Sequence, residues 1–260
     1  MNTIELRAAT VRVDGRTILG PIDWMVGAGE RWVVLGANGS GKTTLVRLVS
    51  ATRFPSDGEA VILGERLGRT DMRVLRERIG HASARLAASL RPTLTALDVV
   101  MTARHAALEP WWHTYTEGDR ARAGDLLAAA GLEGFQDRTF GTLSEGERQR
   151  VLVSRAFMGP VELVTLDEPA AGLDLRNREL LVRMLSNLAT ATTAGPIVLI
   201  THHVEEIPDG FTHVLLLREG TPIACGPIRE TLTSETLSST FGADFVLERR
   251  HGRFSANLRQ

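Results

Sequence analysis

The sequence contains a single cysteine, Cys225. One cysteine excludes an internal disulfide and a metal site built from several cysteines, and its simplest interpretation is a small, buried apolar residue. The sequence also lacks any run of about 18 apolar residues, which excludes a membrane-spanning helix. Its first residues contain no apolar stretch of signal-peptide length. Together these absences favour a cytoplasmic protein.

An excess of charge of one sign is also missing. The formal net charge is −1, from 30 basic and 31 acidic residues. This balance argues against broad electrostatic binding to nucleic acid or anionic lipid, so nucleic acid is not an expected partner. The hydrophobic content of 43% is typical of a globular protein. A length of 260 residues fits one large domain, or a core with an inserted sub-domain.

Strand patterns occupy both ends of the chain, and helical patterns occupy its middle. Apolar and polar residues alternate over residues 3–13, and "RWVVLG" leads directly into a glycine loop and a helix. Residues 84–159 carry apolar residues at helical spacing. Strand patterns return in "VELVTLDEP", "PIVLITHH" and "THVLLLREG". The last two are near-continuous apolar runs, as expected for parallel strands covered on both faces. The chain therefore predicts an α/β fold with a helical sub-domain over 84–159.

The glycine loop "GANGSGKTT" fits the phosphate-loop pattern, in which Gly36 is followed after four residues by Gly41, Lys42 and Thr43. Glycines let successive backbone N–H groups turn toward phosphate oxygens, and the following helix presents its N-terminus to the same anion. Lys42 would contact the terminal phosphates, and the Thr43 hydroxyl would bind Mg²⁺. A glycine-rich turn without a ligand is the alternative, which the flanking strand and helix disfavour. The expected nucleotide-binding residues are Gly36, Asn38, Gly39, Ser40, Gly41, Lys42, Thr43 and Thr44.

Two acids, Asp167 and Glu168, end the strand pattern "ELVTLDEP". In a nucleotide-binding sheet, ligands lie beyond the carboxyl ends of the strands. Asp167 is suited to holding Mg²⁺ together with Thr43. Glu168 is suited to polarising the water that attacks the γ-phosphate, so it is a candidate catalytic residue. Two acids at a strand end are common, and the prediction depends on their combination with the phosphate loop.

The motifs "GANGSGKTT", "LSEGERQR", "LVTLDEP", "AGLD" and "ITHH" follow one another along the chain. Over residues 4–232 the sequence resembles an ATP-binding-cassette (ABC) ATPase. The resemblance implies one domain over 1–232, with a P-loop NTPase (RecA-like) core, an antiparallel β sub-domain and an inserted helical sub-domain. It also implies a Mg-dependent ATPase that powers a transporter, docked on separate permease subunits at the inner face of the cell membrane. "RPTLTALDVV" and "FGTLSEGER" further resemble a subgroup associated with molybdenum transport.

The resemblance also implies roles for residues to which the individual motifs give none. Two such domains pair head to tail, so Ser144, Glu145 and Gly146 would contact the γ-phosphate of ATP held by the other subunit. Asp174 would lie at the dimer seam. His202 would be the switch histidine that contacts the γ-phosphate during catalysis, whereas its neighbour His203 has no equivalent role. Ser144 also stands where a serine caps a helix, and the two roles are compatible.

Two positions depart from the family pattern. The aromatic residue that stacks on adenine is replaced by an aliphatic one near Val13. Ala84 stands where most transporter ATPases have a glutamine that reaches toward Mg²⁺ and senses the membrane partner. This departure supports an alternative function, a soluble ABC ATPase that acts on a cytosolic assembly. A third hypothesis, a nucleotide switch without turnover, is disfavoured because Glu168 is present.

Two further segments leave alternatives open. Trp111, Trp112 and Tyr115 form either a docking surface or the core of the helical sub-domain. Residues 233–260 form a polar, basic tail that we expect to be loosely ordered. Such a tail is most simply solvated, and contact with lipid or RNA is the alternative.

Overall fold

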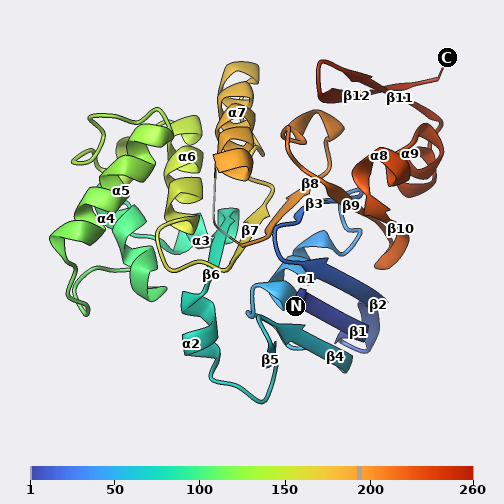
Figure 1. The fold of residues 1–260 in the computed structure, drawn as a ribbon, viewed down its shortest axis with the longest axis horizontal. Helices are drawn as coiled ribbons and strands as arrows, with labels where there is room; N and C mark the ends of the chain where they lie inside the picture. The colour runs from blue at the N-terminus through green and yellow to red at the C-terminus, as the bar shows by residue number, and fades with distance from the viewer. Residues whose placement is uncertain (1, 192–194, 260) are drawn as a thin grey trace.

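The computed structural model describes residues 2–191 and 195–259. At its centre is a six-stranded sheet of order β10-β9-β3-β8-β7-β6 (Figure 1). The pairs from β9 to β6 are parallel, and β10 joins β9 in antiparallel fashion. All five residues of β8 are buried, as its apolar run predicted. The strands are β3 (Arg31–Leu35), β6 (Ile79–Ser83), β7 (Leu163–Asp167), β8 (Ile197–Thr201), β9 (His213–Arg218) and β10 (Thr221–Pro227).

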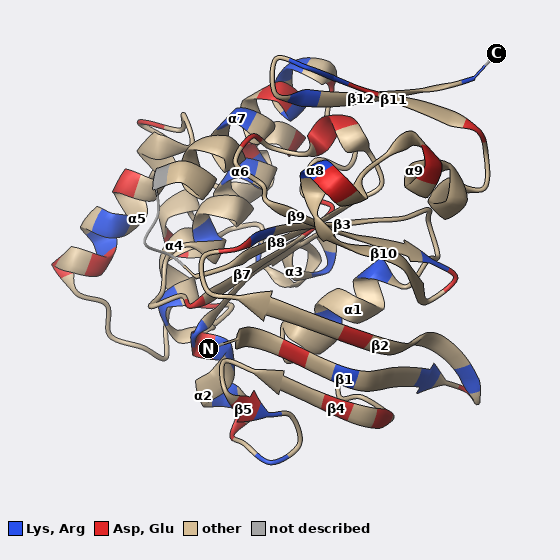
Figure 2. Cartoon of the chain, turned by 45° about the vertical axis from the view of Figure 1, so that its right-hand side comes forward, with Lys and Arg blue, Asp and Glu red and all other residues tan. Residues whose placement is uncertain are grey.

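A second, antiparallel sheet has the order β2-β1-β4-β5. Its long strands β1 (Asn2–Val13) and β2 (Arg16–Gly27) are joined by the turn that Asp14 and Gly15 predicted. Strands β4 (Asp57–Ile62) and β5 (Glu65–Arg66) complete it. Figure 2 shows helix α1 (Lys42–Val49) between the two sheets, with acidic and basic residues interspersed along the chain. The antiparallel β sub-domain is thus present.

Side chains of the central strands alternate between two hydrophobic cores, because successive residues of a strand point to opposite faces. Val34 and Ile200 belong to the core that contains α1 and the antiparallel sheet. Val33 and Leu199 belong to the core that contains helices α6 (Glu145–Ala156) and α7 (Leu175–Ala191). Helices α1 and α6 therefore cover opposite faces of the central sheet.

Between β6 and β7, each regular element of the described chain is a helix, and loops connect these helices. Figure 1 shows these helices gathered on one side of the sheet. Trp111 and Trp112 are 59% and 84% exposed, so the interpretation of both as sub-domain core is wrong. Tyr115 does pack against the core. The elements are α3 (Ala84–Ser89), α4 (Ala96–Met101), η1 (Thr102–His105), α5 (Glu117–Ala129), η2 (Phe140–Thr142) and α6; α2 (Met72–Glu77) precedes β6.

The C-terminal segment is ordered, so the expectation of a loose tail is wrong. After α8 (Ile228–Thr231) it forms helix α9 (Ser234–Phe241) and a hairpin of β11 (Phe245–Arg250) and β12 (Arg253–Leu258). The hairpin buries Phe254 and packs on the short helix η3 (Val204–Glu206). Long-range packing of this kind leaves little trace in a polar, basic sequence.

Cys225 is exposed, so its expected burial is also wrong. It lies on β10, the edge strand of the central sheet, where every second residue faces outward. Among the described residues, none of the helices has the length and hydropathy to span a bilayer.

Candidate nucleotide-binding and catalytic site

The phosphate loop, Asp167, Glu168 and His202 come from chain segments that meet at one edge of the central sheet. Strands β3, β8, β7 and β6 are parallel neighbours, so their carboxyl ends lie in a row. The phosphate loop follows β3, and His202 follows β8. Asp167 is the last residue of β7 and Glu168 comes directly after it, while Ser83 is the last residue of β6. This row is the place where open α/β sheets bind ligands.

The phosphate loop leaves the start of α1 open toward an anion. Gly41 caps α1 with a φ of 97°, and no side chain in the described structure caps the helix. Gly36 is required by close approach, since a Cβ there would lie 2.3 Å from the carbonyl oxygen of Leu217. Of the other predicted loop residues, Ser40 is buried, whereas Asn38, Gly39 and Thr43 are exposed and Thr44 is partly buried.

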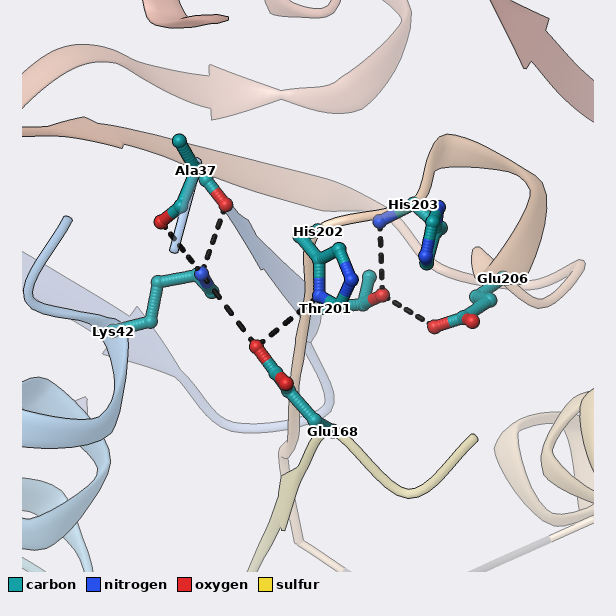
Figure 3. A network of polar contacts seen from close by, with 8 residues as sticks. Ala37, Lys42, Glu168, Thr201, His202, His203 and Glu206 are labelled. Atoms are coloured by element: carbon teal, nitrogen blue, oxygen red, sulfur yellow. Dashed lines mark hydrogen bonds and ion pairs between the residues drawn. The ribbon is translucent and has the colours of Figure 1, made fainter. Parts of the chain in front are cut away.

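The ammonium group of Lys42 lies between the loop and the end of β7. Only 4% of its side chain is exposed. Nζ donates to the carbonyl oxygens of Gly36 (2.8 Å) and Ala37 (3.0 Å) and lies 3.6 Å from Oε1 of Glu168 (Figure 3). Burial lowers the pKa of Lys42, and the nearby Glu168 and Asp167 oppose that shift. The ammonium group of Lys42 is thus held at the loop, next to the two acids.

Glu168 connects Lys42 to His202. Its Oε1 lies 3.3 Å from Nδ1 of His202 (Figure 3). Its N–H donates to the carbonyl oxygen of Ile200 (3.0 Å). Its φ of 49° places a non-glycine residue in the left-handed region. Such strain costs about 1–3 kcal/mol and is concentrated at functional sites. The neighbouring His203 donates its backbone N–H to Oγ1 of Thr201 (3.1 Å).

Asp167 has the features of a metal ligand. Its Oδ1 is buried and has no hydrogen-bond partner among the described residues. The pKa of Asp167 is raised to about 6, first by burial and then by the adjacent Glu168, while Lys42 opposes the shift. Asp167 and Thr43 line the same cavity of about 790 Å³. A carboxylate and a hydroxyl are oxygen donors of the kind that Mg²⁺ prefers, so these residues fit Mg²⁺.

The same cavity is lined by Ser83 and Ala84, at the position where the resemblance implies a glutamine. Ser83 caps α3 by accepting from the N–H of Leu86 (3.2 Å), and Ala84 is the first helical residue. His81 also lines the cavity and bonds Ser83 through Nε2 (3.0 Å). The polar groups here are therefore a hydroxyl and an imidazole.

Val13, the other position that departs from the family pattern, lies at the end of β1 and is 36% exposed.

The predicted turn of residues 144–146 forms a separate cluster. Ser144 caps α6, accepting from the N–H of Glu147 (3.4 Å) while its N–H and hydroxyl donate to the Glu147 carboxylate (2.7 and 2.8 Å). The capping role is therefore confirmed. Ser144 and Glu145 are exposed at the start of the helix. Gly146 is required by packing, since a Cβ there would lie 2.5 Å from the side chain of Asn177.

Asn177 joins this cluster to Asp174. It donates to both carboxylate oxygens of Asp174, through its N–H (2.8 Å) and its side-chain amide (2.9 Å). These bonds hold the pKa of Asp174 below its usual value. Sequence reasoning missed Asn177, because a polar residue in the first turn of a helix has no distinctive signal. The structure thus brings the turn 144–146 and Asp174 together.

Comparison with known proteins decides the family. Residues 19–171 match the family model described as ABC transporter. An uncharacterized ABC transporter ATP-binding protein of Bacillus subtilis, YlmA, is 37% identical over 92% of this chain and 90% of its own length. The chain belongs to the ABC transporter family. It is one of the ATP-binding cassettes of this family, which are ATPases.

Two further comparisons extend the picture of the cassette. The manganese transport system ATP-binding protein MntB of Halalkalibacterium halodurans is 29% identical over 85% of this chain and 84% of its own length. Among solved structures, the cassette MJ0796, a dimer in a post-hydrolysis state bound to ADP and Pi, aligns with a TM-score of 0.74. That alignment has 24% identity and covers 87% of this chain and 99% of that chain. The structural likeness confirms the predicted fold class.

Proposed function

We propose that this cassette binds and hydrolyses Mg-ATP and works as a head-to-tail homodimer on separate membrane permease subunits. The observation that carries the proposal is the position of the Glu168 carboxylate, 3.6 Å from Lys42 and 3.3 Å from His202. A base for the attacking water must lie beside the groups that hold the γ-phosphate. Glu168 meets this requirement.

Each residue at the sheet edge has a role in the proposed reaction. The open N-terminus of α1 and the ammonium of Lys42 bind the phosphates. Mg²⁺, when held by Thr43 and Asp167, neutralises charge on the phosphate oxygens. Glu168 accepts a proton from the attacking water. His202, bonded to Glu168, contacts the γ-phosphate and orients that carboxylate.

The turn 144–146 and Asp174 support the dimer. Helix α6 starts on the face of the sheet opposite to α1, so the two phosphate motifs begin helices that belong to different cores. Ser144 and Asp174 are exposed. A head-to-tail pair would bring this exposed helix start to the nucleotide of the other subunit, where backbone N–H groups and the helix dipole favour an anion.

Two observations support the transport role: the relatives of this chain, and an exposed aromatic surface on the helical sub-domain. The name of MntB makes a metal-containing cargo the first substrate class to test, and the molybdenum-like stretches favour the same class. Trp111 and Trp112 expose large aromatic surfaces on the helical sub-domain. Exposed aromatic residues are typical of the centres of protein interfaces, so this surface is our candidate for contact with the permease at the inner membrane face.

The test compares Glu168→Gln with wild type and with Glu162→Gln. Glu162 directly precedes β7, at the opposite end from Glu168, and pairs with Arg78, so it is a control carboxylate away from the site. Glu168→Gln should retain ATP binding, lose about 10²–10⁴-fold in kcat, and sediment as a dimer with Mg-ATP. Glu162→Gln should behave as wild type. Wild-type turnover by Glu168→Gln would refute the assigned base.

The same trapped dimer identifies the partner. Tagged Glu168→Gln is purified with Mg-ATP from its native cell, with and without membranes. A co-purifying multi-span protein supports the transporter function. If only soluble partners co-purify and none of the cassette is in the membrane fraction, the alternative of a soluble ABC ATPase replaces it.

A further inference from the structure

The C-terminal hairpin forms a two-stranded sheet of its own, next to the loop that carries His202. β11 and β12 pair over six residues each. Figure 1 shows the hairpin at one end of the molecule, near α7 and the segment after β8. β12 is in contact with η3, which begins two residues after His202.

One side chain of the hairpin, Arg253, joins two elements of the candidate site. Its Nη1 and Nη2 donate to the two carboxylate oxygens of Glu179, at 2.9 and 3.2 Å. Nη2 also donates to the carbonyl oxygen of Glu205, at 2.5 Å. A guanidinium is planar and carries several fixed donors, so it can hold two partners in a defined relative position.

The two partners belong to segments with proposed roles in catalysis. Glu179 lies in the second turn of α7, the helix that starts directly after Asp174 and carries Asn177. Glu205 lies in η3, three residues after His202. Arg253 therefore connects residues 202–206, which we call the switch loop, to helix α7, which starts directly after Asp174.

Further contacts hold the switch loop at both of its ends. Thr201, before His202, bonds the buried carboxylate of Glu206. The side chain of Glu205 accepts from the N–H of Ala256 in β12, at 3.3 Å. The switch loop is thus in contact with the hairpin as well as with the end of β8.

We propose that Arg253 is a positioning residue, which holds the switch loop against α7 so that His202 stays within reach of Glu168 and the γ-phosphate. This inference rests on the proposed function, since it needs His202 to act in hydrolysis. The polar tail is then part of the catalytic apparatus, although it touches neither substrate nor reacting atoms.

The test uses Arg253→Met, which keeps the aliphatic stem but removes the donors. Arg250→Met is the matched control, because Arg250 lies in the same hairpin and pairs with Glu248 of that hairpin. Arg253→Met should lower kcat about tenfold and leave the Kd for ATP within about twofold, since small misplacements of catalytic groups act on the chemical step. Arg250→Met should retain both values.

Glu179→Gln provides a second variant, which leaves the packing of Phe254 of the hairpin in the core unchanged. It should lower kcat in the same direction, and the double variant with Arg253→Met should be no slower than Arg253→Met alone. A merely structural hairpin would instead give a lower Tm with an unchanged kcat below that Tm, and this result would overturn the inference.

His202→Ala, measured in parallel, separates the two possible failures. If His202→Ala lowers kcat and Arg253→Met does not, the inference about Arg253 is wrong and the proposed function stands. If His202→Ala keeps the wild-type kcat, the role of His202 in the proposed function is wrong, and the role of Arg253 is wrong with it.

Discussion

His81 should make the stability of the cassette depend on pH. Both of its ring nitrogens are bonded inside the fold. Thr165 donates to the carbonyl oxygen of Gly80 (3.2 Å), so its hydroxyl oxygen accepts from Nδ1–H of His81 (2.9 Å). Nε2 then accepts from the hydroxyl of Ser83 (3.0 Å). The network fits a neutral imidazole with its proton on Nδ1, and a second ring proton on Nε2 would require the Ser83 hydroxyl to turn from donor to acceptor.

The magnitude follows from the pKa. The pKa of His81 is lowered from 6.5 to about 4, first by burial and then by the nearby Arg155, while a hydrogen bond to the backbone of Thr165 opposes the shift. The unfolded chain therefore binds more protons than the folded one between these two values, so stability falls as the pH falls through that window. Relative to neutral pH, the loss from this one residue is about 2 kcal/mol at about pH 5 and about 3 kcal/mol at about pH 4.

The assay is urea unfolding of wild type and His81→Gln at about pH 7.5 and about pH 5. Glutamine keeps hydrogen-bonding capacity and cannot gain a proton in this range. The unfolding free energy of wild type should fall between the two pH values by about 2 kcal/mol more than that of His81→Gln. His251→Gln, in the exposed turn of the C-terminal hairpin, is the control and should retain the wild-type pH dependence. Parallel pH profiles of wild type and His81→Gln would refute the reasoning.

Two other predictions concern the phosphate motifs. Ser144→Arg should bind ATP normally and lose about a hundredfold or more in kcat, because the guanidinium would cover the start of α6. Weakened ATP binding in the isolated chain would instead show that this turn contacts the nucleotide bound by the same chain. Lys42 is the only lysine in the sequence, so ATP at about ten times its Kd should slow its labelling by an amine-reactive reagent about tenfold, as measured by mass spectrometry. The N-terminal amine is the internal control, and unprotected labelling of Lys42 would contradict its place at the phosphates.

The sequence predicts the parts of the site whose chemistry is local. The spacing of Gly36, Gly41 and Lys42 specifies a loop that curls around an anion, and the structure has that loop between a strand and a helix. Asp167 and Glu168 were placed by the apolar run before them, which predicted β7 correctly. In each case a few adjacent residues determine both the backbone conformation and the chemistry.

The sequence misses the parts that depend on distant contacts. The tail was expected to be loose because its composition is polar and basic, yet Arg253 binds Glu179, 74 residues away. The prediction that Cys225 is buried is wrong, because its exposure depends on the position of β10 at the edge of the sheet. That position follows from the order of the strands. Ser144 lies between these cases. Its cap is a local feature and was anticipated, whereas its contact with a second subunit stays a prediction.

Asp167 and Glu168 show how one backbone conformation gives two adjacent acids different chemistry. Asp167 is the last residue of β7 and keeps the strand geometry, which leaves its Oδ1 buried. A second residue in strand geometry would point to the opposite face of the sheet. Glu168 instead has a φ of 49° and bonds its N–H to Ile200 of the neighbouring strand. Its carboxylate therefore lies between Lys42 and His202 at the sheet edge. The strain at one residue thus separates the proposed metal ligand from the proposed base.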